Sequence, residues 1–161
     1  MRVRKAEQQE QQKRNEQKWT KPVMAAGYTV IPYVIIDRQD AIGLTAVEMN
    51  LILHLANLWW RPETLPFPSK AMLAKRMDCS TKTVQRAFAR LERDGLIERK
   101  TRFSRGGGQM SNYYDFAGLI KAAEAFAQEE LARREKRKSE DERHGNRKRP
   151  LRVVKDQEDE E

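Results

Sequence analysis

Residues 80–93, STKTVQRAFARLER, combine hydroxyl, amide and cationic side chains at helical spacing. Their apolar members would share one face of a helix: Val84, Ala87, Phe88 and Leu91. The opposite face would carry Lys82, Gln85, Arg86, Ala89 and Arg93, and Arg90 is a further cationic candidate for DNA contact. Arginine or lysine can donate to O6 and N7 of guanine, and glutamine can pair with N6 and N7 of adenine. This segment therefore has the chemistry to contact base edges, although a solvated charged face is the alternative.

A second helical pattern lies immediately before this segment. Ser69 is its expected N-cap, and its apolar residues are expected to be buried: Met72, Leu73 and Met77. Only Asp78, Cys79 and Ser80 separate the two patterns. We expect Asp78 to end the earlier helix in a left-handed conformation, Cys79 to pack inward, and Ser80 to cap the next helix. So short a connection predicts a helix-turn-helix arrangement, in which the second helix enters the DNA major groove.

Further elements are expected on both sides of this pair. Residues 27–37, GYTVIPYVIID, indicate a strand over 28–36. Because Pro32 cannot donate a ladder hydrogen bond, this strand should lie at a sheet edge or break at Pro32. Thr45 and Glu48 fit a capping box for a helix from about Thr45 to Trp60. That helix would bury one face: Val47, Leu51, His54, Leu55 and Leu58.

A β-hairpin is expected after the helices. Residues 96–103 and 110–116 read as strands joined by the glycine-rich SRGGGQ. The hairpin carries a second group of cations: Arg99, Lys100, Arg102 and Arg105. These side chains could reach the minor groove or flanking phosphates, or simply protect a soluble sheet edge.

The resulting order is strand, three helices and two strands, which is an α+β winged-helix topology with a further C-terminal helix. The stretch FPSKAMLAKRMDCSTKTVQRAFARLERDGLI resembles the winged helix-turn-helix of bacterial regulators and of plasmid or phage replication-initiation proteins. The shared pattern in residues 68–97 is Pro-Ser, Leu-Ala, Ser-x-x-Thr-Val-x-Arg and Leu-x-x-x-Gly-Leu-Ile. Asp78 stands where the family usually has glycine.

The resemblance covers roughly residues 28–116 and is specific for the fold. It implies that Ser80 and Thr81 meet the DNA backbone. It also implies that four residues approach base edges: Lys82, Thr83, Gln85 and Arg86.

Composition and charge fit this reading. The formal charge of +8 and the pI of about 9.7 favour a polyanionic partner. The one cysteine and two histidines are too scattered for a metal site, and Gly106–Gly108 lacks the lysine of a phosphate loop. We therefore expect no metal, no cofactor and no catalytic centre. No apolar run is long enough for a signal peptide or membrane span, so a cytoplasmic protein is expected.

Composition predicts a division into three parts. Residues 1–21 form a Gln-rich basic arm with 7 basic and 3 acidic side chains, expected to be disordered or loosely helical. Residues 22–131 form the winged-helix domain with its C-terminal helix. Residues 132–161 form a charged tail that is expected to be disordered and could bind a protein partner.

The C-terminal helix of residues 117–131 has an apolar stripe: Leu119, Ala122, Ala123, Phe126 and Ala127. It could pack on its own domain or pair two copies in a homodimer.

Taken together, the sequence predicts a protein that binds double-stranded DNA with sequence preference. A bacterial or mobile-element transcriptional regulator is the first expectation. Initiation or control of plasmid or phage replication is the alternative within DNA binding. A winged helix that binds RNA or another protein is the alternative of another class.

Overall fold

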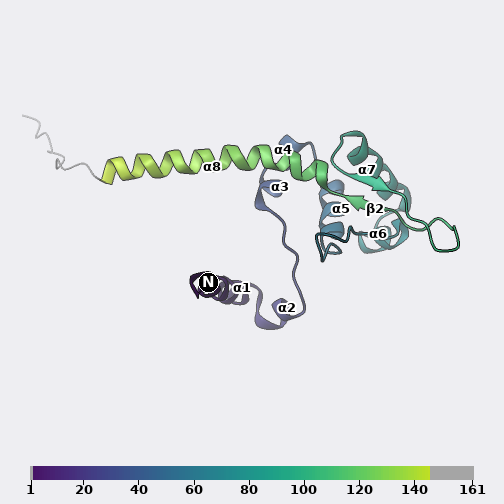
Figure 1. The fold of residues 1–161 in the computed structure, drawn as a ribbon, viewed down its shortest axis with the longest axis horizontal. Helices are drawn as coiled ribbons and strands as arrows, with labels where there is room; N and C mark the ends of the chain where they lie inside the picture. The colour runs from purple at the N-terminus through teal and green to yellow at the C-terminus, as the bar shows by residue number, and fades with distance from the viewer. Residues whose placement is uncertain (1, 146–161) are drawn as a thin grey trace, which may run out of the picture. The chain divides into compact units, whose positions relative to one another are not determined.

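The computed structural model describes residues 2–145, and the side chains of residues 10–143 (Figure 1). The elements in chain order are α1 (Arg2–Trp19), α2 (Lys21–Ala25), α3 (Tyr33–Asp37), α4 (Gln39–Ile42), α5 (Ala46–Ala56), α6 (Lys70–Arg76), α7 (Thr81–Arg93), β1 (Glu98–Lys100), β2 (Tyr113–Asp115) and α8 (Ala117–Gly145). Contacts divide the chain into a unit of residues 1–123 and a second unit that begins at residue 124. The expected α+β class with a small sheet is confirmed.

The core lies between α5, α6, α7 and the hairpin of β1 and β2 (Figure 1). At its centre the ring of Phe88 on α7 stacks on Tyr114 of β2, with 4.3 Å between the ring centroids. Fully buried aliphatic side chains surround this pair: Leu51, Leu55, Leu73, Val84, Leu91 and Leu119. The apolar stripe predicted for the third helix is therefore confirmed.

Side-chain caps fix where these helices begin. The Ser69 and Ser80 hydroxyls accept hydrogen bonds from the backbone N–H groups of Met72 and Thr83, at 3.1 and 3.0 Å. Thr45 and Glu48 form the expected capping box at the start of α5. All three predicted N-caps are confirmed.

The turn between α6 and α7 has the predicted form. Asp78 has φ of 48°, which places it in the left-handed region where aspartate is tolerated. Cys79 is half-buried, and its N–H donates to the Ala74 carbonyl at 3.0 Å. The turn thus satisfies an open carbonyl at the end of α6 before α7 begins.

The hairpin is present but shorter than predicted. β1 and β2 are antiparallel, with Arg99 opposite Tyr114. Beyond them Phe103 bridges Gln109, and Gly107 in the turn has φ of +80°. The regular strands are therefore limited to residues 98–100 and 113–115 and do not extend over the predicted ranges 96–103 and 110–116.

The strand predicted over residues 28–36 is wrong. Residues 33–37 form α3, and residues 28–32 have no regular structure. Val34 and Ile35 are both buried although they are adjacent, whereas a strand would point them to opposite faces. The Tyr114 N–H donates instead to the Pro66 carbonyl at 2.9 Å, so the loop before α6 lies along β2. The loop that contains Pro66 therefore lies next to β2, where the predicted strand of residues 28–36 would have paired.

α5 also differs from its sequence pattern. It ends at Ala56 rather than near Trp60, and Val47 is 41% exposed. Met49 and Ile52 are buried, so the apolar face is rotated toward them. The error arose because this segment is apolar on several faces, which weakens the periodic signal.

The first turns of α8 pack on the domain. The Leu119 N–H donates to the Leu96 carbonyl at 2.8 Å, and Leu119 and Ala123 are buried. Gly118 crosses the turn after α7 so closely that an added Cβ would lie 1.8 Å from the Gly95 carbonyl oxygen. These contacts support the expectation that the helix covers its own domain, while the homodimer through 117–131 stays a prediction.

The terminal extensions are helical where the structure describes them. α1 covers most of the predicted arm, and α8 continues through residues 132–145 of the predicted tail. The rest of that tail, residues 146–161, lies outside the described residues. The division of the chain at residues 21 and 131 stays a prediction.

Candidate nucleic-acid interface

The N-terminal half of α7 presents a polar surface to solvent. Ser80, Thr81, Lys82, Gln85 and Arg86 are exposed. Thr83 is half-buried, and its hydroxyl lies 2.9 Å from that of Ser80. This surface follows from the sequence pattern, because the stripe opposite it is buried in the core.

Lys82, Gln85 and Arg86 are available to a ligand. Within the described part of the chain, their side chains have no hydrogen-bond or ion-pair partner. An arginine without an internal partner keeps all five of its donors for an external acceptor. These three residues are therefore the strongest base-contact candidates on α7.

Arg90, in contrast, is bonded to other groups of the domain. Its Nε lies 3.4 Å from Oε1 of Glu48, whose side chain is only 3% exposed, and one of its terminal nitrogens donates to the Gly43 carbonyl at 3.0 Å. It also pairs with Asp94 at 3.6 Å. Thr45 supplies the other hydrogen bonds to Glu48, from its backbone N–H and its hydroxyl. Arg90 thus joins α7 to the start of α5.

Arg93 occupies the exposed end of the same helix. Its Nε donates to Asp94 at 3.0 Å, and this hydrogen bond holds the pKa of Asp94 below its ordinary value. The pair is on the surface, where such contacts contribute little stability. Arg93 can exchange this partner for a phosphate at small cost.

Two cations of the wing form internal ion pairs. Arg99 makes a bidentate contact with Glu92, with its Nε at 2.9 and 3.0 Å from the two carboxylate oxygens. Lys100 donates to Asp115 at 2.6 Å. These hydrogen bonds lower the pKa values of Glu92 and Asp115. Arg99 and Lys100 therefore tie the hairpin to α7 and to its own second strand.

Arg102 lies at the base of the wing. Its guanidinium lies over the Phe67 ring at 4.1 Å, and its Nε donates to the Ser111 carbonyl at 3.2 Å. The Ser111 hydroxyl in turn donates to the Phe67 carbonyl at 2.7 Å. Arg105, near the tip, is exposed and has no internal contact among the described side chains. Arg102 is therefore fixed at the base of the wing, whereas Arg105 at the tip is available to an external ligand.

The comparison with protein families agrees with this geometry. Residues 43–97 match the family described as a helix-turn-helix domain. The match runs from Gly43 to Ile97, at the entry to the wing, and includes α5, α6 and α7. The chain contains a winged helix-turn-helix domain.

Two solved structures are similar to this chain. The N-terminal domain of the DnaD protein from Geobacillus kaustophilus HTA426 is 22% identical, with a TM-score of 0.51, covering 70% of this chain and 91% of that one. A possible transcriptional regulator from Methanosarcina mazei Go1 is 21% identical, with a TM-score of 0.42, covering 67% and 84%. No curated protein matches the chain. At these identities the first of these structures supports the fold alone.

A helix-turn-helix domain indicates DNA binding and points to a protein that binds rather than catalyses. Among the side chains of residues 10–143, no cluster of three or more His, Cys, Asp or Glu could hold a metal ion. No helix within residues 2–145 is long and apolar enough to cross a membrane.

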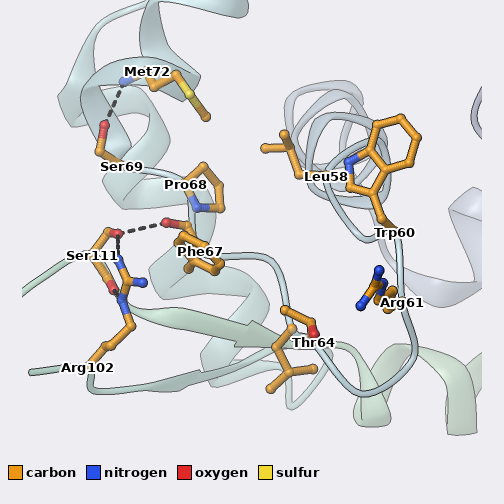
Figure 2. Close-up of a pocket in the computed structure, with 11 residues that line it drawn as sticks. Leu58, Trp60, Arg61, Thr64, Phe67, Pro68, Ser69, Met72, Arg102 and Ser111 are labelled. Atoms are coloured by element: carbon orange, nitrogen blue, oxygen red, sulfur yellow. Dashed lines mark hydrogen bonds between the residues drawn. The ribbon is translucent and has the colours of Figure 1, made fainter. Parts of the chain in front are cut away.

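One surface near the wing lies outside the predicted site residues. A cavity of about 650 Å³ lies beside Arg102, and its wall includes the exposed Trp60 and Arg61 (Figure 2). In the sequence this surface is marked only by the adjacent pair Trp59 and Trp60, which is compatible both with core packing and with a stacking platform. Only the three-dimensional arrangement shows that the two rings have different environments.

Proposed function

We propose that this winged-helix protein binds double-stranded DNA with sequence preference and regulates transcription in the cytoplasm. One observation carries the proposal: Lys82, Gln85 and Arg86 are exposed on the outward face of α7 and have no partner among the described side chains. Their neighbours on the opposite face fix the helix in the domain. The three side chains are thus presented by a rigid element, as base readout requires.

The roles of the residues on α7 follow from their chemistry. Arg86 donates to guanine O6 and N7, and Gln85 pairs with adenine. Lys82 supplies a further donor to a base edge or a phosphate. Ser80 and Thr81 meet the DNA backbone, where the positive end of the 13-residue helix favours a phosphate.

The cations of the wing divide into two groups in this proposal. Arg105 contacts phosphate or the minor groove, because it is exposed at the tip and has no partner within residues 10–143. Arg99, Lys100 and Arg102 mainly hold the hairpin in place, because their donors already have acceptors. Of the C-terminal cations on α7, Arg90 has a structural role and Arg93 adds a phosphate contact.

The test begins with selection of bound fragments from random DNA. The preferred site and a scrambled duplex are then titrated with the parent protein and two variants at several salt concentrations. Arg86→Ala should weaken the preferred site by about 1–3 kcal/mol and relax one base position, with a smaller effect on the scrambled duplex. Arg105→Ala is the matched control. It should weaken both duplexes alike and reduce the salt slope by about 1.

The opposite pattern contradicts the assignment. If Arg86→Ala weakened both duplexes equally while Arg105→Ala removed the discrimination, the wing would be the reading element. Competition between duplex DNA and duplex RNA of matched length tests the alternative of another class. RNA should compete poorly, because the deep, narrow major groove of an A-form helix excludes α7.

The proposal includes two possible protein partners, a second copy of the chain and another protein. A regulator that binds two half-sites would pair through residues 117–131, which sedimentation with and without the selected DNA would show as a dimer. A replication role would instead require the tail of residues 132–161 to recruit another protein. Pull-down with and without those residues separates regulation from replication control.

A further inference from the structure

An open, largely apolar groove lies beside the wing (Figure 2). Its volume is about 650 Å³, within the range of roughly 300–1,000 Å³ that is typical of ligand sites. Figure 2 shows Trp60 and Arg61 on one side of it and Phe67 and Arg102 on the other. The groove is therefore bounded by both the loop after α5 and the base of the wing.

The two adjacent tryptophans differ in environment. Trp59 is half-buried and stacks on Phe116, with ring centroids 5.2 Å apart. Trp60 is 79% exposed at the edge of the groove. Phe67, across from it, is also exposed. Exposed aromatic rings gathered at a concave surface are characteristic of a binding site rather than of packing.

The charged groups of the groove are all cationic. Arg61 and Arg102 line it, and none of its described lining residues is acidic. Arg102 is fixed with its planar group over the Phe67 ring at 4.1 Å and its Nε bonded to the Ser111 carbonyl. Arg61 is exposed. An anionic ligand with planar apolar groups would match both the charge and the shape of these side chains.

We propose that this groove binds unpaired bases of single-stranded DNA, with a base stacked on Trp60 and the phosphate backbone next to Arg61. Stacking on aromatic rings in a cationic groove is how proteins bind single strands without reading sequence. The exposed ring of Trp60 and the planar guanidinium of Arg102, which lies over the Phe67 ring, favour a nucleobase over an apolar peptide. The proposal rests on the proposed function, since the base of the DNA-binding wing forms one side of the groove.

Such a groove adds a second mode of DNA binding to the domain. α7 would hold a duplex while the groove holds a strand released from it. Single strands arise where a duplex is opened, so the groove would act on DNA that is opened next to the bound duplex.

The test uses the full-length protein and a labelled oligo(dT) of about 12 nucleotides, with a labelled duplex in parallel. Fluorescence anisotropy gives both affinities for the parent and for Trp60→Ala, Trp60→Phe and Trp19→Ala. Trp19 is the matched control, because it is 63% exposed and lies on α1 outside the groove. Melting curves verify that each variant is folded.

The expected result is specific to one residue and one ligand. Trp60→Ala should weaken oligo(dT) binding by about 5- to 150-fold, as expected for the loss of one stacked base. Trp60→Phe should restore part of this loss, and Trp19→Ala should change nothing. The duplex affinity should stay within twofold for all three variants.

Cross-linking gives a second measurement that needs no variant. Oligo(dT) carrying 5-iodouracil is irradiated with the parent protein, and the adduct is located by mass spectrometry. An adduct on Trp60 or Phe67 supports the proposal, whereas adducts confined to other residues overturn it.

Other outcomes are equally decisive. Failure of the parent to bind oligo(dT), unchanged oligo(dT) affinity in Trp60→Ala, or an equal loss in Trp19→Ala overturns the proposal. Unchanged affinity would direct attention to a peptide as the occupant of the groove. If the parent fails to bind any duplex but loses oligo(dT) binding in Trp60→Ala, the proposed function is wrong and the single-strand site stands.

Discussion

Arg86 and Arg90 lie one helical turn apart on α7, yet the structure predicts opposite consequences of removing them. Arg86 is exposed and has no internal partner among the described residues. Arg90 contacts the buried Glu48 at 3.4 Å and the Gly43 carbonyl at 3.0 Å. We therefore expect Arg90→Ala to reduce stability and Arg86→Ala to reduce DNA recognition.

The cost of Arg90→Ala lies between two limits. Breaking a fully buried ion pair costs about 3–5 kcal/mol, and breaking an exposed one costs about 0–1 kcal/mol. The Arg90 side chain is 41% exposed, and Glu48 would keep its two hydrogen bonds from Thr45. Together with the lost bond to Gly43, this gives an estimate of about 1–3 kcal/mol. For a domain of about 100 residues, the Tm should fall by roughly 5–20 °C.

Thermal melting by circular dichroism and DNA titration below the transition measure the two effects separately. Arg86→Ala should melt within about 0.5 kcal/mol of the parent, as expected for an exposed substitution. Arg90→Ala should bind the preferred duplex nearly normally while it is folded. Equal melting of the two variants would refute the structural role of Arg90. Loss of duplex binding by folded Arg90→Ala, with normal binding by Arg86→Ala, would refute the division of roles.

Three further predictions concern the framework of the site. Phe88→Ala should cost about 3–5 kcal/mol by removing a fully buried ring, and a Tm within a few degrees of the parent would contradict its place in the core. Gly118→Ala should destabilise by about 1–3 kcal/mol despite the better helix propensity of alanine, whereas Gly106→Ala, with open space around it, should be nearly neutral in urea denaturation. The pKa values of Glu92 and Asp115 are lowered in the folded protein, so their ionised carboxylates stabilise the fold when the pH is above their unfolded pKa values. The Tm should therefore fall as the pH drops from about 5 toward 3. The double variant E92Q/D115N should flatten that fall, and an unchanged slope would contradict the contribution of these carboxylates.

The helix-turn-helix could be predicted because its determinants are local. Ser69 and Ser80 cap helices through residues three positions away, and Asp78 adopts its turn conformation through its own backbone preference. The stripe that includes Phe88 has helical spacing with a polar opposite face. For α7 the sequence by itself determines the element, its limits and its buried face. On α6 the predicted face is only partly right, because Leu73 and Ala74 are buried whereas Met72 and Met77 are half-buried.

Tertiary structure decided what depends on distant partners. Residues 28–32 have β-prone side chains but form no strand, because a strand requires a neighbour and the Tyr114 N–H is already bonded to Pro66. The sequence patterns predicted DNA contacts for Arg86, Arg90 and Arg102 alike. Only folding brings Glu48 to Arg90 and Phe67 to Arg102, and it leaves Arg86 exposed. The sequence therefore determined the recognition helix and its cationic character, and the tertiary structure decided which cations are occupied, because an ion pair depends on distance in space rather than in the chain.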